Sequence, residues 1–387
     1  MPNAYFKQQG PAITPPNDPK FSGENRLSII HTEWSDGWGG QEHRIISELS
    51  GMLARGHRML LVTRPSAKIG AVAKDRGIPV TFLPFRNKAD FQTVVQLMRL
   101  VKEDGYQIIH THSSLDTWVG AIAAKLSGAY FVRTRHLNLP MKSRWYNVHG
   151  HYDRLITCGN TMKSLLIDEY GFNRDRVVSI PTGIDFNRFV PQRHRADIRS
   201  ELALSDNSFV ILMAGVVRSV KRYDVALRAF AKTLEDIPDA HLVIAGNGPL
   251  LEKMIALSEH LGIRSSVHWL GHRQDVADLM IAADAVLLTS RSEGIPQVIS
   301  QALGLERPCV ATSVGGVPEI ILHNETGLLV APGSEAEISS ALLKIAHNRE
   351  WASTLGERGG QFIRQNLNLS LMLDKTEQLY WEMMHID

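Results

Sequence analysis

The sequence predicts an α/β protein built from two domains, each with a parallel sheet covered by helices. Short apolar, β-rich segments alternate with segments of helix length from Leu27 onward, and the same alternation starts again after residue 185. Such alternation indicates parallel strands, because each crossover helix returns the chain to the same edge of the sheet. A chain of 387 residues is also too long for one ordinary core and fits two domains of common size.

The candidate strands fall into two series. The first series comprises residues 27–31, 59–63, 80–83, 108–110, 131–133 and 155–157, and the second comprises residues 209–213, 241–245, 267–270, 285–289 and 309–311. We therefore predict Rossmann-like domains over residues 25–185 and 186–366, facing each other across a cleft, where ligands favour binding. We expect residues 367–387 to form a final helix that either crosses back to the first domain or packs within the second.

Composition excludes several classes of protein. Residues 1–24 hold five prolines and few large apolar residues, so we expect a disordered or loosely attached tail without a signal peptide. No segment approaches the roughly 20 apolar residues of a membrane span, so any membrane contact is expected to be peripheral. The net charge of +2 gives no reason to propose a nucleic-acid partner. Cys158 and Cys309 lack metal-ligand spacing and are expected to be buried free thiols, which fits a cytoplasmic protein.

Glu293 is the most informative residue of the sequence. It follows the predicted strand 285–289 and precedes a predicted helix, at the end of a parallel strand where ligands bind in open α/β sheets. A carboxylate there can hold a substrate hydroxyl, while the backbone at the start of the helix can meet phosphate oxygens. That start comprises Gly294, Ile295, Pro296 and Gln297. A carboxylate that caps a surface helix is an equal alternative.

A basic segment follows the first strand of the second domain. Gly215 opens it, and Arg218 and Lys221 supply cations at a strand-to-helix turn. Cations in this place can meet the charge that accumulates on a departing diphosphate. Arg222 is an alternative to Lys221 as the second cation, and a solvated loop is the alternative reading of the whole segment.

The segment around Glu293 resembles the motif of retaining nucleotide-sugar glycosyltransferases of family 4, in which seven residues separate two glutamates. Here the second position is Gln301. The resemblance covers nearly the whole sequence after the tail and implies the GT-B fold, with the acceptor in the first domain and the donor in the second. In the family the first Glu contacts the donor sugar and the second holds ribose hydroxyls. Gln301 therefore affects expected donor affinity more than sugar chemistry, since an amide still bonds to a diol.

The resemblance also assigns roles to residues at other strand ends. Gly39 and Gly40 match a loop that reaches the donor phosphates, and His136 matches a histidine that contacts the transferring sugar. The remaining matches are the glycine-rich turn with Gly246 and Gly248, near the nucleotide, and Arg273, beside the base. Tight turns and a structural histidine are the alternatives. We expect His110 and His112 to point to opposite sides of their strand, so that at most one contacts ligand.

The sequence thus predicts a retaining, metal-independent hexosyltransferase that uses a nucleoside diphosphate sugar and needs no cofactor. The expected acceptor is a saccharide or lipid-linked hydroxyl in cell-envelope polysaccharide or lipopolysaccharide biosynthesis. The alternatives are an epimerase or phosphorylase of similar fold, and a nucleotide-sugar-binding protein without turnover. Residues 141–152 interleave cations and aromatics. They are expected either to rest on anionic lipid at the inner face of the membrane or to form a solvated helix with its aromatics packed inward.

Overall fold

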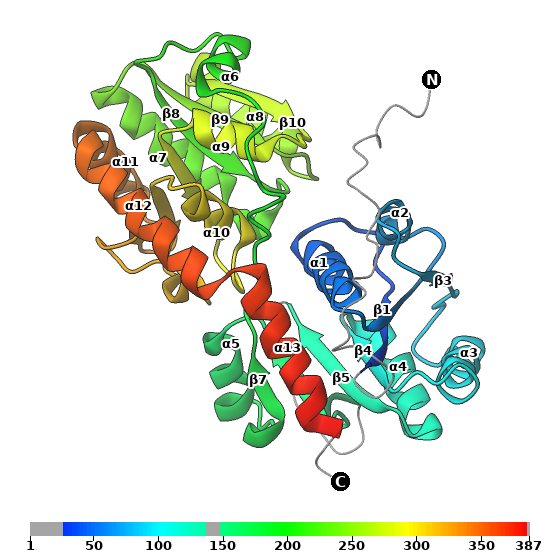
Figure 1. Cartoon of the computed structure of the whole chain (residues 1–387). Helices are drawn as coiled ribbons and strands as arrows, with labels where there is room; N and C mark the ends of the chain where they lie inside the picture. The colour runs from blue at the N-terminus through cyan, green and yellow to red at the C-terminus, as the bar shows by residue number, and fades with distance from the viewer. Residues whose placement is uncertain (1–25, 137–147, 385–387) are drawn as a thin grey trace. The chain divides into compact units, whose positions relative to one another are not determined.

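The computed structural model describes residues 26–136 and 148–384, which form two compact units (Figure 1). The first unit contains the described chain up to Gly183 and the segment from Leu369 onward, and the second unit contains Ile184–Asn368. Each unit has one sheet in which all strand pairs are parallel. The two parallel α/β units confirm the predicted fold class. The predicted tail, residues 1–24, lies outside the described residues.

The sheet of the first unit has the strand order β3-β2-β1-β4-β5-β6-β7. Its strands are β1 (Ser28–Glu33), β2 (Arg58–Thr63), β3 (Val80–Phe82), β4 (Ile108–Thr111), β5 (Tyr130–Arg135), β6 (Arg154–Thr157) and β7 (Val177–Ser179). The helices of this unit are α1 (Gly40–Ala54), α2 (Lys68–Asp75), α3 (Phe91–Lys102), α4 (Ser114–Ser127), α5 (Asn160–Ser164) and α13 (Leu369–Met384).

The sheet of the second unit has the strand order β10-β9-β8-β11-β12-β13. Its strands are β8 (Phe209–Ala214), β9 (Ala240–Ala245), β10 (Val267–Gly271), β11 (Ala285–Leu288), β12 (Cys309–Thr312) and β13 (Leu328–Val330). The helices are α6 (Arg195–Glu201), α7 (Tyr223–Asp236), α8 (Leu251–His260), α9 (Val276–Ala282), α10 (Gln297–Gly304), α11 (Glu335–His347) and α12 (Arg349–Asn366).

Apolar side chains on both faces of each sheet explain why the strands read as continuous hydrophobic runs. In β1, Ile30 belongs to the core on one face and Ile29 to the core on the other. In β8, Ile211 and Leu212 likewise belong to opposite cores. Successive side chains of a strand alternate between faces, so a sheet covered by helices on both faces needs apolar residues at consecutive positions.

The strand predictions are confirmed, but two strands were missed. Both β7 and β13 lie at the end of their sheet and are three residues long. An edge strand pairs on one side only, and a run of three residues gives a weak apolar signal, although β3, of the same length, was predicted from residues 80–83.

The final helix packs against the first unit. Met372, Leu373, Leu379 and Tyr380 of α13 join the core that contains the inner residues of α1, and Figure 1 draws this helix in red beside that unit's strands. At Gly51 of α1, an added Cβ would lie 2.3 Å from a methyl carbon of Leu373, so glycine permits the close approach of the two helices. The units divide at residues 183/184, two residues before the predicted boundary.

Candidate functional site

The candidate donor site lies where the strand order of the second unit reverses. The chain moves outward from β8 to β9 and β10 on one side and from β11 to β12 and β13 on the other. The loops that follow β8 and β11 therefore leave neighbouring strands in opposite directions. Ligands of open α/β sheets bind at this point, beyond the carboxyl ends of the strands.

An ion pair joins these two loops. Lys221 Nζ, after β8, donates to Glu293 Oε1, after β11, at 2.6 Å. Ser290 Oγ donates to the same oxygen at 2.5 Å. The side chains of Lys221 and Glu293 are 16% and 13% exposed, so both groups are partly desolvated yet still reach solvent. The structure thus brings together two of the residues that the sequence placed in the site.

Hydrogen bonds from the β11 loop fix the backbone that carries Lys221. Thr289 Oγ1 donates to the carbonyls of Lys221 and Arg222 at 2.9 and 3.0 Å. Arg222 has a left-handed φ of 52°, between a single 3-10 turn and α7, and its side chain is bonded to Asp224. Lys221, rather than Arg222, is therefore the cation that contacts Glu293. Arg218 is exposed three residues earlier.

Glycines allow the loops of neighbouring strands to touch through their backbones. A Cβ at Gly246 would lie 1.9 Å from the carbonyl oxygen of Gly215, and one at Gly248 would lie 2.4 Å from that of Val217. On the other side of the switch point, a Cβ at Gly315 would lie 1.9 Å from the carbonyl oxygen of Glu293. These distances leave no room for a side chain, so the glycines keep the loops in place around the ion pair.

Helix α10 begins directly after the Glu293 turn. Pro296 is its N-cap, and Gln297 is its first residue, as predicted. The first N–H groups of a helix have no partner within the helix, so the segment Gly294 to Gln297 offers donors beside Glu293. Gln301 lies one turn further along, on the same side as Gln297, and is partly buried.

Arg273, predicted beside the base, is bound to acidic neighbours. Its guanidinium donates to Asp275 at 2.7 and 2.5 Å and to Glu201 at 2.8 Å. Hydrogen bonds to Asp275 and then Glu201 raise the pKa of Arg273. These contacts hold the loop after β10 against α6, and any role toward a ligand stays a prediction.

In the first unit, the strand order reverses between β1 and β4. Gly39 is the N-cap of α1, and Gly40 is the first residue of the helix. Glu42 accepts the Gly39 N–H at 2.8 Å, so a carboxylate already occupies one donor of this helix start. The structure places the two glycines at a strand-to-helix turn, as predicted, and their role toward a donor phosphate stays a prediction.

Sequence reasoning missed a buried carboxylate beside this turn. Glu33, the last residue of β1, accepts hydrogen bonds from Ser113 Oγ at 2.6 and 2.8 Å, from Ser35 N at 2.7 Å and from Gln41 Nε2. Burial, with the nearby Asp116 carboxyl, raises the pKa of Glu33 to about 8. The predicted strand ended two residues too early, so Glu33 was not recognised as a strand-end residue.

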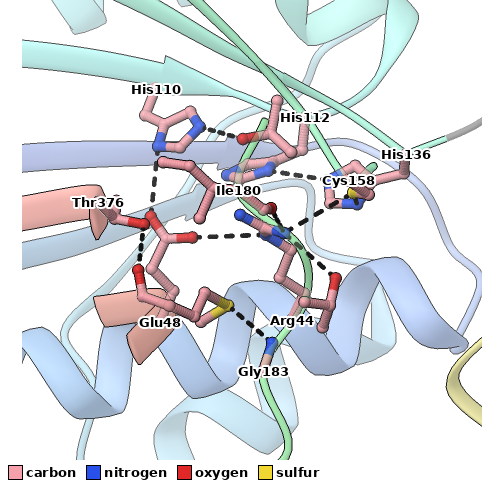
Figure 2. Close-up of polar contacts among 12 residues, drawn as sticks. Arg44, Glu48, His110, His112, His136, Cys158, Ile180, Gly183 and Thr376 are labelled. Atoms are coloured by element: carbon pink, nitrogen blue, oxygen red, sulfur yellow. Dashed lines mark hydrogen bonds and ion pairs between the residues drawn. The ribbon is translucent and has the colours of Figure 1, made fainter. Parts of the chain in front are cut away.

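His136, the residue after β5, is half-buried and held by its own unit. Its Nε2 lies 3.2 Å from His112 Nδ1, and its Nδ1 lies 3.7 Å from Cys158 Sγ (Figure 2). Burial, followed by the charges of Arg44, Arg133 and Arg135, lowers the pKa of His136 well below the usual value. Its ring is therefore a neutral group fixed from two sides.

The expectation that His110 and His112 point to opposite sides is wrong. Their rings stack with centroids 4.4 Å apart, because side chains two residues apart on a strand share one face. Both rings are buried, together with His31 of β1. Cys158 and Cys309 are buried free thiols, as predicted.

A second group that the sequence did not reveal surrounds these histidines. Arg44 and Glu48, one turn apart on α1, are fully buried, with Nε and Oε2 3.7 Å apart. Tyr380 of α13 donates to Glu48 Oε1 at 3.0 Å and also lies 2.6 Å from His110 Nδ1. Two opposite charges one turn apart, each directly followed by an apolar residue, Ile45 or Leu49, were the available signal in the sequence.

The spacing of three histidines also resembles a metal centre. Ring nitrogens of His31, His110 and His112 lie within 4.8 Å of one another. However, His31 Nδ1 and His112 Nε2 are 2.9 Å apart, and His110 Nε2 is 2.7 Å from Thr134 Oγ1. A buried Arg44 cation nearby also opposes a second cation. The contacts favour a hydrogen-bonded network.

The proposed membrane segment is residues 141–152, of which 141–147 lie outside the described residues. In its described part, Tyr152 is buried and its ring stacks on Phe172, with centroids 5.9 Å apart. Across residues 26–136 and 148–384, no helix has both the length and the apolar character needed to cross a bilayer.

Comparison with known proteins identifies the family. The chain matches the family described as Glycosyltransferase Family 4 over residues 38–188, and Glycosyl transferases group 1 over residues 194–362. It is 26% identical over 310 residues to the UDP-Gal:alpha-D-GlcNAc-diphosphoundecaprenol alpha-1,3-galactosyltransferase of Escherichia coli, covering 76% of this chain and 80% of that protein. It is also 26% identical over 350 residues to the D-inositol 3-phosphate glycosyltransferase of Actinosynnema mirum, covering 80% and 84%.

Solved structures show the same fold. A glycosyltransferase from Rickettsia africae superposes with a TM-score of 0.86 at 20% identity, covering 94% of this chain and 100% of that one. The Anabaena protein HepE, solved in complex with UDP-glucose, gives a TM-score of 0.82 at 19% identity, covering 92% and 100%. Together with the two family matches, which span most of the sequence, these likenesses show that the chain belongs to the family 4 glycosyltransferases of GT-B fold.

Proposed function

We propose that this glycosyltransferase moves a hexose-like unit, with retention of configuration, from a nucleoside diphosphate sugar to an acceptor hydroxyl in cell-envelope glycan assembly. The observation that carries the proposal is the 2.6 Å contact between Lys221 and Glu293 at the switch point of the second unit. This contact places a cation that would bind the diphosphate beside a carboxylate that would bind the sugar.

Lys221 and Arg218 would bind the diphosphate. Negative charge grows on the phosphate oxygens as the bond to the sugar breaks, and fixed cations stabilise that charge without reorganising. The N–H groups of Ile295 and Gln297 at the start of α10 would add donors for the same oxygens. The protein itself would thus supply the positive charge, in agreement with a metal-independent reaction.

Glu293 would hold hydroxyls of the donor sugar. The hydrogen bonds from Lys221 and Ser290 converge on Oε1, so they fix the orientation of the carboxylate. Oε2 would then accept from the sugar. Gln301, one helical turn beyond Gln297, would meet the ribose hydroxyls through its amide.

The other residues singled out would complete the donor site. Gly215, Gly246 and Gly248 would bring backbone close to the nucleotide, and Arg273 would stand beside the base. From the first unit, Gly39 and Gly40 would approach the donor phosphates, and His136 would contact the transferring sugar.

Two relatives support the choice of substrates. The name of the Escherichia coli relative specifies a UDP-sugar donor and a lipid-diphosphate acceptor, and HepE was solved with UDP-glucose. We propose a UDP-sugar donor and a lipid-linked saccharide acceptor. Contact with the inner face of the membrane through residues 141–152 would bring the protein to such an acceptor.

The test is incubation of the protein with UDP-, GDP- and ADP-sugars and a panel of saccharide and undecaprenyl-diphosphate acceptors. Proton NMR of the product gives the configuration of the new bond. Transfer with the donor's anomeric configuration supports the proposal. Release of an isomerised nucleotide sugar would instead indicate an epimerase, binding without turnover would indicate a sensor, and an inverted product would overturn the retaining assignment.

A further inference from the structure

Three histidines, His31, His112 and His136, form a hydrogen-bonded row through the first unit. They come from β1 and from the ends of the neighbouring strands β4 and β5, so parallel pairing places them side by side. His31 Nδ1 is 2.9 Å from His112 Nε2, and His112 Nδ1 is 3.2 Å from His136 Nε2. We call these three residues the histidine row.

Different groups face the two ends of the row. His31 Nε2 lies 3.7 Å from Glu48 Oε1, and His136 Nδ1 lies 3.7 Å from Cys158 Sγ. Arg44 contacts both of these facing groups. Its Nε is 3.7 Å from Glu48 Oε2, and its Nη1 is 3.7 Å from Cys158 Sγ. Figure 2 shows Arg44 between the labelled Glu48 and Cys158, with His112 and His136 above.

The row has only two arrangements of its protons. Burial lowers the pKa of His31 to about 3 and those of His112 and His136 well below the usual value, so all three rings are neutral. A neutral imidazole has one N–H and one acceptor nitrogen. If His112 donates from Nε2 to His31, it must accept from His136 at Nδ1. All three rings then carry the proton on Nε2, and in the opposite arrangement all three carry it on Nδ1.

Glu48 selects between the two arrangements. Burial raises the pKa of Glu48, while the Arg44 charge and the Tyr380 hydrogen bond lower it. Because Arg44 is also fully buried and an unpaired buried guanidinium is costly, we take the adjacent Glu48 as its carboxylate partner. His31 then presents an N–H, rather than a lone pair, toward Glu48. At the other end, burial raises the pKa of Cys158, so this group is a thiol whose S–H can donate to His136 Nδ1, 3.7 Å from the sulfur. Both ends favour protons on Nε2.

Glu48 also determines the tautomer of His110, which carries its proton on Nδ1 and not on Nε2. Tyr380 donates to Glu48 Oε1, so its oxygen must accept from His110 Nδ1 at 2.6 Å. Thr134 Oγ1 can then donate to His110 Nε2 at 2.7 Å. One unit therefore holds two kinds of histidine, with different protonated nitrogens, around one carboxylate.

We infer that Glu48, acting through His31 and His112, fixes His136 as a neutral ring protonated on Nε2, so that these three are positioning residues for His136. Both ring nitrogens of His136 are then committed to protein partners. His136 serves transfer by its fixed shape and dipole and does not donate or accept a proton during the reaction. The role in transfer rests on the proposed function, whereas the protonation state does not.

NMR of the full-length protein labelled with ¹⁵N-histidine tests the inference at neutral pH. Long-range proton–nitrogen correlations distinguish the two neutral forms of imidazole, and single His→Gln variants assign the signals. We expect Nε2–H for His31, His112 and His136, and Nδ1–H for His110. A His136 that is protonated on Nδ1, doubly protonated or averaged between forms overturns the inference, whatever the protein's activity.

Two substitutions at His112 separate positioning from packing. An Asn amide reaches the place of Nδ1 and can keep the contact with His136, whereas a Gln amide reaches the place of Nε2 and keeps only the contact with His31. We expect His112→Asn to preserve the single form of His136 and to lower kcat by less than about 5-fold. His112→Gln should give an averaged His136 and lower kcat by at least about 10-fold, with donor KM little changed.

His241 and His268 provide a matched control. They form a similar pair in the second unit, with ring nitrogens 3.1 Å apart, away from the proposed site. His241→Gln should leave kcat and the His136 signal unchanged.

Equal loss of kcat in His112→Asn and His112→Gln, with the His136 signal unaltered in both, would show that the histidine row acts only through packing. If neither His112 variant folds, the wild-type spectrum alone decides. If no donor is turned over, the proposed function fails while the spectrum still tests the row.

Discussion

At the scale of single residues, the two cations of the donor site differ in their surroundings. Lys221 is bonded to Glu293 and is only 16% exposed, whereas Arg218 is exposed. A cation in a partly dry place contributes more to charge stabilisation than one in solvent. The two positions should therefore respond differently to the same substitution.

We expect Lys221→Ala to weaken binding of the free nucleoside diphosphate. It should also slow transfer by raising the activation free energy by about 2–4 kcal/mol. Arg218→Ala should have the same sign and a smaller effect. Calorimetry with UDP and initial-rate kinetics measure both, and the exposed Lys253 provides Lys253→Ala as a control for loss of a surface charge. Unchanged UDP affinity in Lys221→Ala would remove this lysine from the site.

For Gln301 we predict the direction in which a substitution changes UDP affinity. If its amide meets the ribose hydroxyls, Gln301→Glu should keep or improve UDP affinity, because a carboxylate accepts stronger hydrogen bonds from a diol. Calorimetry measures the change directly. A large drop in affinity would show that the pocket is built around the amide, and an unchanged affinity in Gln301→Ala would place the side chain away from the nucleotide.

Glu33 makes stability depend on pH. Burial, with Asp116, raises its pKa to about 8 from 4.5, so the folded protein keeps a proton that the unfolded chain releases. The free energy of unfolding should therefore fall as pH rises from 4.5 to 8. His31, whose pKa burial lowers from 6.5 to about 3, acts with the opposite sign below pH 6.5.

Urea unfolding of the first unit between about pH 6.5 and 8 isolates the contribution of Glu33 from that of the histidines. We expect the wild-type midpoint to fall across this window and Glu33→Gln to reduce the slope. Equal slopes for the two proteins would mean that Glu33 is ionised in the fold.

Sequence reasoning found residues at strand ends but not the buried polar network. Glu293 and Lys221 could be predicted because each follows a recognisable strand. Arg44, Glu48 and Tyr380 could not, because their importance comes from contacts between α1 and α13 that are more than 300 positions apart. The two-residue period of a strand places His110 and His112 on the same face, so the expectation of opposite faces misapplied that period.

At the scale of elements, α13 completes the first unit. Met372, Leu373, Leu379, Tyr380 and Met383 are buried there, and Arg55 of the first unit binds Asp374 and Glu377. A fully buried side chain of this size contributes about 1.5–3 kcal/mol. The helix therefore matters on the scale of a domain's whole stability, roughly 5–15 kcal/mol.

We expect a chain ending at Asn368 to lose the fold of the first unit and to keep that of the second. Hydrogen exchange reads each unit separately, and a chain ending at Met384 is the control. Protection should vanish in β1, β4 and α1 while persisting in β8 and β11. Wild-type protection of β1 in the shortened chain would show that α13 is dispensable.

The two strands that were missed, β7 and β13, have three residues each and lie at the end of their sheets, but β3 is equally short, also lies at the end of its sheet and was predicted over residues 80–83. Short length therefore makes a strand harder to recognise without preventing its recognition. The sequence did not decide which unit the final helix packs against. Its apolar residues suit either unit, and only packing, such as Leu373 against Gly51, decides.

At the scale of the whole molecule, two sheets of the same design use their switch points differently. In the second unit the loops meet through the partly buried pair Lys221 and Glu293, which suits an anionic ligand. In the first unit they meet through the fully buried Glu33, bonded to Ser113. Composition and periodicity predicted two such sheets, but only the folded contacts show that one switch point carries a cation and the other a buried carboxyl group whose pKa is raised.

The central claim is that Glu293 acts on the sugar while the neighbouring cations act on the diphosphate. The most direct measurement compares kcat and UDP affinity for wild type, Glu293→Gln and the exposed-site control Glu325→Gln, with the donor and acceptor found active. We expect Glu293→Gln to lower kcat by about 100-fold or more while UDP affinity stays within about 3-fold, because the interaction lost belongs to the transition state. Glu325→Gln should match wild type. Transfer by Glu293→Gln at a near wild-type rate would contradict the account.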